Sequence, residues 1–165
     1  MVVVNNLSKV YPYPVMEWND YFAGCGGGTS SIKEAMFNGE KVCRVKTALN
    51  HWPTAIKSHT HAHPEVHHIT DDIRKFNPFN MPKYTEGVWT AAVAGVDCTF
   101  HSGAKGGASR DSDSRALAEE LPAYVKATNP EVFVVENVKE FKNWGPLIPK
   151  VMTFANKGKK KGKKI

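Results

Sequence analysis

The chain has 165 residues, of which 41% are hydrophobic and 10% aromatic, enough to build one folded domain but not two. This composition excludes disorder as the default state, and the lack of any long uninterrupted apolar run argues against a membrane-spanning helix. The formal net charge of +6 arises from six lysines in residues 157–165, so the remainder of the chain is close to neutral. We expect residues 148–165 to be a basic tail, either a solvated, disordered end or an arm that contacts phosphates without reading sequence.

Three cysteines, Cys25, Cys43 and Cys98, lie far apart and are odd in number. They predict neither a disulfide framework nor a CxxC metal pair. This pattern suits a reducing cytosol, where a lone cysteine can act as a nucleophile. Residues 1–6 are briefly apolar without a basic leader, so we expect no signal peptide and a cytoplasmic protein.

Strand-like and helix-like segments alternate along the chain. We expect strands over 15–23, 41–49, 66–69, 88–95 and 131–136. We expect helices over 52–59, over 115–127, and after a hydroxyl N-cap at 29–31, the last one closed by Asn38-Gly39. Residues 77–82 read as a proline- and asparagine-rich loop, and residues 98–114 as a long mobile loop rich in Gly, Ser, Asp and Lys.

This alternation predicts an α/β fold with a doubly wound, mainly parallel sheet of about five strands and flanking helices. Ligands of such sheets gather where the strands end, which here places the polar and glycine positions Gly24, Asn50, Asp72, Asp97 and Glu136 at one edge. We also expect an unpaired sheet edge that needs a partner.

The segment Gly24-Cys25-Gly26-Gly27-Gly28 joins the first strand to the first helix. A glycine turn at this point lets the backbone approach an anionic or nucleotide ligand, and the helix N-terminus favours a carboxylate or phosphate. A tight turn without a ligand is the alternative interpretation.

Two further residues stand at strand ends. Cys98 follows the fourth strand and reads either as an exposed nucleophile or as a small buried hydrophobe. Glu136 closes an apolar strand, where a carboxylate is costly unless it is paired, although charged residues also commonly mark strand ends.

Together these segments resemble a known family. Its motifs correspond, in order and separation, to Phe22-Ala23-Gly24-Cys25-Gly26-Gly27, Asp97-Cys98 with Ser102, Ser114-Arg115, and Glu136-Asn137-Val138. Over about residues 17–147 the chain is similar to the first half of the cytosine-5 DNA methyltransferases, most closely phage-like members. The resemblance implies a Rossmann-like methyltransferase fold that uses S-adenosyl-L-methionine (AdoMet), with an N-terminal extension at 1–14 and a catalytic domain at 15–147. It implies a cytoplasmic enzyme of a bacterium or a phage-infected host.

The resemblance also implies a role for individual residues. The AdoMet contacts would be Phe22, Ala23, Gly24, Cys25, Gly26, Gly27, Asn50, His51, Asp72, Ile73 and Gly95. Cys98 would be the nucleophile and Glu136 the acidic partner of the target base. The substrate and DNA loop would include Ser102, Lys105, Ser114, Arg115 and Asn137.

These residue types suit methylation at carbon 5 of cytosine. A thiolate that adds at carbon 6 makes carbon 5 nucleophilic toward the methyl group, and an acid beside ring nitrogen 3 stabilises the addition. The base must leave the duplex stack before either face is reachable, so the implied substrate is double-stranded DNA.

The chain departs from the family at several points. Asp97 precedes the nucleophile where most members have proline, and Asn50 stands where a glutamate usually binds the ribose. We find no Gln-x-Arg-x-Arg segment, target-recognition region or closing C-terminal motif, so the fold is incomplete relative to the family. The alternatives are one part of a split enzyme whose recognition region lies on a separate chain, a truncated non-catalytic relative that binds DNA or a partner, and a tRNA cytosine-5 methyltransferase.

Five histidines, His59, His61, His63, His67 and His68, crowd into ten residues. No cysteine lies near them, and their spacing gives no evident tetrahedral set. We expect surface or core histidines and no bound metal.

Overall fold

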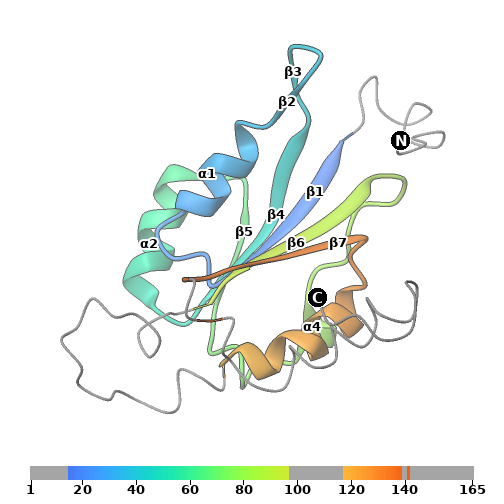
Figure 1. Ribbon diagram of the computed structural model, residues 1–165. Helices are drawn as coiled ribbons and strands as arrows, with labels where there is room; N and C mark the ends of the chain where they lie inside the picture. Colours follow the sequence, from blue (N-terminus) through green and yellow to red (C-terminus); the bar gives the residue numbers. More distant parts are fainter. Residues whose placement is uncertain (1–14, 97–116, 139–140, 142–165) are drawn as a thin grey trace, which may run out of the picture.

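The computed structural model describes residues 15–96, 117–138 and 141 (Figure 1). Its main sheet has five strands in the order β5-β4-β1-β6-β7, and every neighbouring pair is parallel. The strands are β1 (Met16–Tyr21), β4 (Cys43–Asn50), β5 (His67–Thr70), β6 (Trp89–Gly95) and β7 (Val132–Glu136). The predicted α/β class and strand number are therefore confirmed.

Helices cover both faces of the sheet (Figure 1). On one face lie α1 (Gly27–Lys33) and α2 (Pro53–Ala62). On the other lies α4 (Leu121–Thr128), preceded by the 3₁₀ turn η4 (Leu117–Glu120) and packed against the 3₁₀ turn η2 (Pro78–Asn80). Coverage of both faces explains why β6 reads as a run of small apolar residues, since Ala91, Ala92 and Ala94 have no exposed surface.

Two hydrophobic clusters hold these layers together. The larger one joins the sheet to α4 and contains Tyr21, Leu49, Ile73, Met81, Ala92, Ala94, Val96, Ala118, Leu121 and Tyr124. Within it the rings of Tyr21 and Tyr124 meet edge to face, with their centroids 5.2 Å apart. The Tyr124 hydroxyl donates to the carbonyls of Ile73 and Phe76 at 2.9 and 3.1 Å, which fastens the segment after β5 to α4.

The smaller cluster lies under the other pair of helices. It contains Ala23, Val45, Ala48 and Val66, with Trp18 and Ile32 packed against them. This cluster seats α1 and the turn that precedes it on the sheet.

The first predicted helix is wrong at both ends. α1 begins at Gly27 with Gly26 as its N-cap and no side-chain cap, so Thr29 lies inside the helix and is fully buried. Asn38-Gly39 does not close this helix but joins β2 (Met36–Phe37) to β3 (Glu40–Lys41) in a two-stranded antiparallel hairpin. Both turn residues have positive φ, 51° and 84°, which is the backbone that favours Asn-Gly in two-residue hairpin turns.

The predicted helix 115–127 is correct only in part. Its described portion starts as a 3₁₀ turn, and the α-helix begins at Leu121, because Pro122 lacks an N–H and fits only the first turn. The predicted extension 1–14, the loop residues 98–114 and the tail 148–165 lie outside the described residues.

Candidate active site

The carboxyl ends of the parallel strands form one edge of the sheet, toward the lower left of Figure 1. The strand register aligns Tyr21 with Leu49 on one side and Ala94 on the other. It also aligns Gly95 with Glu136 on the two neighbouring strands. The glycine turn, Asn50 and Glu136 therefore share the edge predicted for them, and Gly95 lies beside Glu136 at the same edge.

The turn after β1 has an unusual backbone. Phe22, Gly24 and Gly26 have positive φ values of 62°, 53° and 101°. A non-glycine residue in this region costs about 1–3 kcal/mol, and such strain is concentrated at functional sites. The Ala23 amide donates to the Leu49 carbonyl at 3.2 Å, so the turn is fastened to β4 as well as to β1.

The two sides of this turn differ in what they contact. A side chain at Gly26 would lie 3.0 Å from His63 Cδ2 and 3.2 Å from His59 Cδ2, and one at Gly28 would lie 3.2 Å from the Asp20 carboxylate. At Gly27, in contrast, no atom lies within 4 Å of the corresponding position. One side of the turn is thus closed by protein and the other is open.

The end of β4 carries Asn50 and His51. Asn50 is almost fully buried, and its side-chain oxygen accepts a hydrogen bond from the Trp52 amide at 2.9 Å. That bond leaves the amide NH₂ as the polar group with which Asn50 can contact a ligand. His51 is exposed, and Trp52 is 54% exposed directly after it. Trp52 was not among the predicted site residues, although an aromatic residue directly after a polar strand end is a recognisable signal in the sequence.

The segment after β5 holds Asp72 and Ile73. Arg74 contacts the Asp72 carboxylate through Nε and Nη2, at 3.0 and 2.6 Å. This guanidinium lowers the pKa of Asp72 to about 2, so the carboxylate is ionised at neutral pH. The Ile73 side chain points into the core, and its carbonyl is the acceptor for Tyr124.

Gly95 and Glu136 lie at the ends of β6 and β7, on the other side of the glycine turn from β4 and β5. Glu136 is exposed, and a side chain at Gly95 would lie 3.6 Å from its Oε2 atom. The Asn137 amide donates to the Val96 carbonyl at 2.9 Å, which fastens the ends of β6 and β7 to each other. This bond is a structural contact, and the DNA-loop role of Asn137 stays a prediction.

Several predicted site residues lie outside the described residues. They are the candidate nucleophile Cys98, its neighbour Asp97, and the loop residues Ser102, Lys105, Ser114 and Arg115. Their roles stay predictions.

The histidines divide into buried and exposed positions. His59 and His63 are buried, whereas His61 and His67 are exposed. Burial, together with the neighbouring His68 and His63, lowers the pKa of His59 to about 4. Within residues 15–96, 117–138 and 141, no three His, Cys, Asp or Glu side chains are arranged to hold a metal ion.

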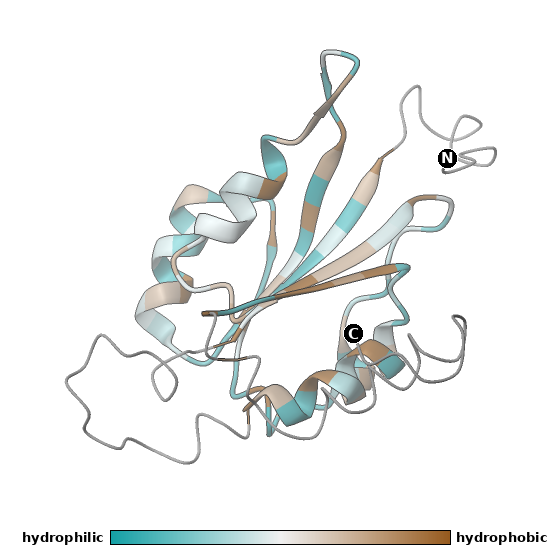
Figure 2. Cartoon of the chain, viewed as in Figure 1, coloured by the Kyte–Doolittle hydropathy of each residue, from teal (hydrophilic) through white to brown (hydrophobic). Residues whose placement is uncertain are grey.

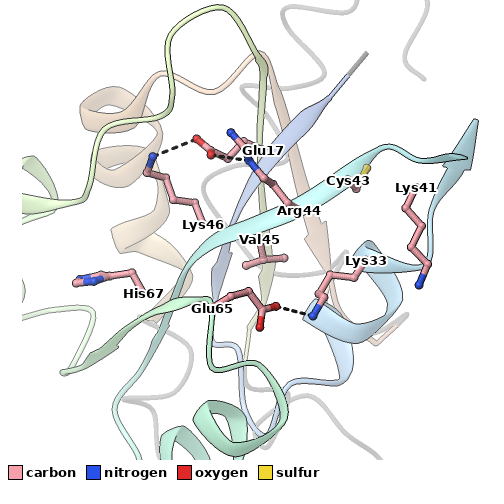
Figure 3. A pocket seen from close by; sticks show the side chains of 9 residues that line it. All are labelled: Glu17, Lys33, Lys41, Cys43, Arg44, Val45, Lys46, Glu65 and His67. Carbon is pink, nitrogen blue, oxygen red and sulfur yellow. Dashed lines mark hydrogen bonds and ion pairs between the residues drawn. The ribbon is translucent and has the colours of Figure 1, made fainter. Parts of the chain in front are cut away.

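A surface pocket of about 560 Å³ lies away from this edge, where β1, β4 and β5 begin (Figure 3). It is lined by Glu17, Lys33, Lys41, Cys43, Arg44, Val45, Lys46, Glu65 and His67. Arg44 and Lys46 pair with Glu17 at 3.0 and 3.4 Å, and Lys33 pairs with Glu65. Both lining carboxylates are therefore paired with lysine or arginine, and the pocket lies at the opposite ends of the strands from the glycine turn. None of the helices described is long and apolar enough to cross a membrane.

Comparisons with known proteins place this chain in a family. A family model described as C-5 cytosine-specific DNA methylase matches residues 16–145. The Type II methyltransferase M.DdeI of Desulfomicrobium norvegicum is 29% identical over 119 residues, which are 72% of this chain and 27% of M.DdeI.

Solved structures show the same fold. A protein encoded within an E. coli prophage and assigned as a DNA modification methyltransferase superposes with a TM-score of 0.62 at 19% identity, over 86% of this chain and 38% of that one. A TehB-like SAM-dependent methyltransferase from Corynebacterium glutamicum superposes with a TM-score of 0.52 at 12% identity, over 90% of this chain and 70% of that one. The chain spans about a quarter of the length of M.DdeI and under two fifths of the prophage protein. Because the family model covers most of its length, the chain belongs to the C-5 cytosine-specific DNA methylases.

Proposed function

We propose that the chain is the AdoMet-binding, cysteine-bearing part of a DNA (cytosine-5)-methyltransferase, with its catalytic domain at residues 15–147. The observation that carries the proposal is the arrangement at the sheet edge. Glu136 stands beside Gly95 at the end of β6, and β6 lies next to β1, which runs into the glycine turn.

The turn fits a ligand that needs close backbone contact. Its open side at Gly27 leaves room for the ligand, while the protein holds the other side in place. The donating amide of Asn50 and the exposed ring of Trp52 lie at the adjacent end of β4. We infer that Asn50 contacts a ribose hydroxyl and that Trp52 covers an aromatic base. AdoMet bound there would supply the methyl group.

Cys98 and Glu136 would carry out the chemistry on cytosine. The Cys98 thiolate adds to carbon 6, and Glu136 donates a proton to ring nitrogen 3, so that the electron pair displaced toward carbon 5 is available for methylation. Removal of the carbon-5 proton then re-forms the double bond and expels the thiolate. Cys98 is two residues after Val96 in the sequence, which is the last described residue of that segment.

The exposed surface of β7 favours a further polypeptide segment in the complete enzyme. Among the described strands β7 is an edge, and Figure 2 shows it as a nearly continuous hydrophobic strand. Val132, Val134 and Val135 are 37–41% exposed on it. Exposed apolar edge strands pair readily with other segments. We therefore propose that a target-recognition region completes the enzyme from this side, on a separate chain in the case of a split enzyme.

The test is transfer of labelled methyl from AdoMet to unmethylated double-stranded DNA. We expect label in the DNA that is lost in Cys98→Ser and kept in Cys43→Ser, because Cys43 is half-buried at the start of β4, far from the proposed site. Transfer of label to tRNA instead of DNA would show that the substrate is tRNA. No label with the full chain, with or without a recognition chain, would refute the enzymatic proposal.

A further inference from the structure

A buried polar row lies beneath the glycine turn. It consists of Asp20, Thr29, His59 and His68, from β1, α1, α2 and β5 respectively. The Thr29 hydroxyl donates to Asp20 Oδ2 at 2.8 Å and lies 3.0 Å from His59 Nε2, and His59 Nδ1 lies 2.8 Å from His68 Nε2. Thr29 and His59 have no exposed surface, and Asp20 is 4% exposed. Four separate elements are therefore joined by three hydrogen bonds, of which the two at Thr29 are buried and the one to His68 is partly buried.

The chemistry of these groups fixes the direction of both bonds at Thr29. Thr29 has one hydroxyl proton, which it gives to the Asp20 carboxylate, so its oxygen must accept from His59 Nε2–H. A neutral His59 then has a free lone pair on Nδ1, which accepts from His68 Nε2–H. With Asp20 ionised, a neutral His59 satisfies all three bonds when His68 carries its proton on Nε2. Burial, which lowers the pKa of His59 to about 4, favours this neutral form near pH 7.5.

The row also touches the turn directly. The imidazoles of His59 and His63 occupy the space beside Gly26, and the Asp20 carboxylate occupies the space beside Gly28. His63 Nε2 lies 3.0 Å from Ser30 Oγ and 3.4 Å from the Gly26 carbonyl oxygen. The position of the turn is thus set by side chains that lie on the side away from its open face.

We propose that His59 is a positioning residue for the AdoMet turn. Held neutral between His68 and Thr29, it fixes the Gly26–Gly28 backbone in the position that ligand binding requires. This inference rests on the proposed AdoMet site. Thr29, itself bound to Asp20, holds the His59 ring at Nε2, and His68 holds it at Nδ1. His68 is half-buried on β5 and bonds to Nδ1 of His59, whereas Thr29 bonds to Nε2 of the same ring.

The experiment measures binding of S-adenosylhomocysteine to the full chain by calorimetry at about pH 7.5, with each dissociation constant corrected for the folded fraction. Thr29→Val keeps the shape but removes the hydroxyl, and should weaken binding about tenfold, whereas Thr29→Ser should restore it to within about twofold of the wild type. Thr60→Val is the matched control, because the Thr60 hydroxyl bonds only within α2 and is exposed.

A second pair keeps the test open if Thr29→Val does not fold. His68→Ala removes the donor to His59 without touching the turn and should weaken binding about fivefold, whereas His68→Gln restores a donor and should recover most of it. Wild-type dissociation constants for both Thr29→Val and His68→Ala would overturn the inference while leaving the AdoMet site standing. A wild-type chain that binds no S-adenosylhomocysteine would overturn both.

Discussion

The buried carboxylate of Asp20 predicts an unusual dependence of stability on pH. Burial raises the pKa of Asp20 from 3.8 to about 6, so the folded protein binds this proton more tightly than the unfolded chain does. Its contribution to stability is fully present below pH 3.8 and is lost as the pH rises through about 6. His59 has the opposite sign, because burial lowers its pKa from 6.5 to about 4 and acidification favours the unfolded chain.

The substitution Asp20→Asn separates these two contributions. Each pH unit of difference in proton affinity is worth about 1.4 kcal/mol, so Asp20 should add about 2 kcal/mol to the stability of the wild type between pH 7.5 and 4.5. His59 removes a similar amount over the same range, so the two largely offset each other in the wild type. In Asp20→Asn only the loss of stability from His59 on acidification remains. We therefore expect the variant to be the more stable protein at pH 7.5 and to lose about 2 kcal/mol relative to the wild type by pH 4.5.

The measurement is urea unfolding followed by circular dichroism at several pH values in this range. Lys33, His63, Glu65, His67 and His68 also lie around His59, but they are common to both proteins and largely cancel in the difference. The matched control is Asp72→Asn. The pKa of Asp72 is lowered to about 2, so its contribution falls away only below about pH 4, and its difference from the wild type should stay nearly constant over most of the range. A difference between Asp20→Asn and the wild type that does not change with pH would refute the buried-carboxylate reasoning.

Three further predictions follow from single contacts. Gly26→Ala should lose S-adenosylhomocysteine binding and about 1–3 kcal/mol of stability, because φ of Gly26 is 101° and two imidazoles lie within 3.2 Å of the added methyl group. Gly27→Ala should leave the free energy of unfolding unchanged or higher, because the space beside Gly27 is open. Equal melting curves for the two variants would contradict this. Glu136→Gln should leave S-adenosylhomocysteine affinity unchanged and slow methyl transfer by about 100-fold in a single-turnover assay, and an unaltered rate would remove Glu136 from the chemistry. Tyr124→Phe should cost about 1–2 kcal/mol in urea unfolding, because it leaves the buried Ile73 carbonyl without its partner.

The sheet was predictable because its strands are locally distinct. The Ala-Val run of β6 is nearly continuous and apolar, as a strand covered on both faces must be. The polar residues at the strand ends indicated the edge at which the glycine turn lies. Asn38-Gly39 was misassigned because the same dipeptide suits a helix C-terminus and a hairpin turn, and only the pairing of Met36 with Lys41 decides between them.

The histidine positions were not predictable to the same degree. The sequence left open whether each histidine was a core or a surface residue, and the structure places His59 in the core and His61 at the surface. Thr29 was expected to be a helix cap because a hydroxyl after glycines favours that role. Its actual role, as the bond between Asp20 and His59, depends on a residue 30 positions away, and no local pattern encodes that contact.

We propose that Cys98 forms a covalent bond to cytosine, with Glu136 as the acidic partner. Double-stranded DNA that contains 5-fluorocytosine tests it most directly, because fluorine at carbon 5 cannot be removed as a proton is and the adduct is trapped. With AdoMet present, we predict a stable protein–DNA complex in which mass spectrometry finds the methylated base on the peptide that carries Cys98, and no such complex with Cys98→Ser. A complex of undiminished yield in Cys98→Ser, or an adduct on Cys25 or Cys43, would contradict the account.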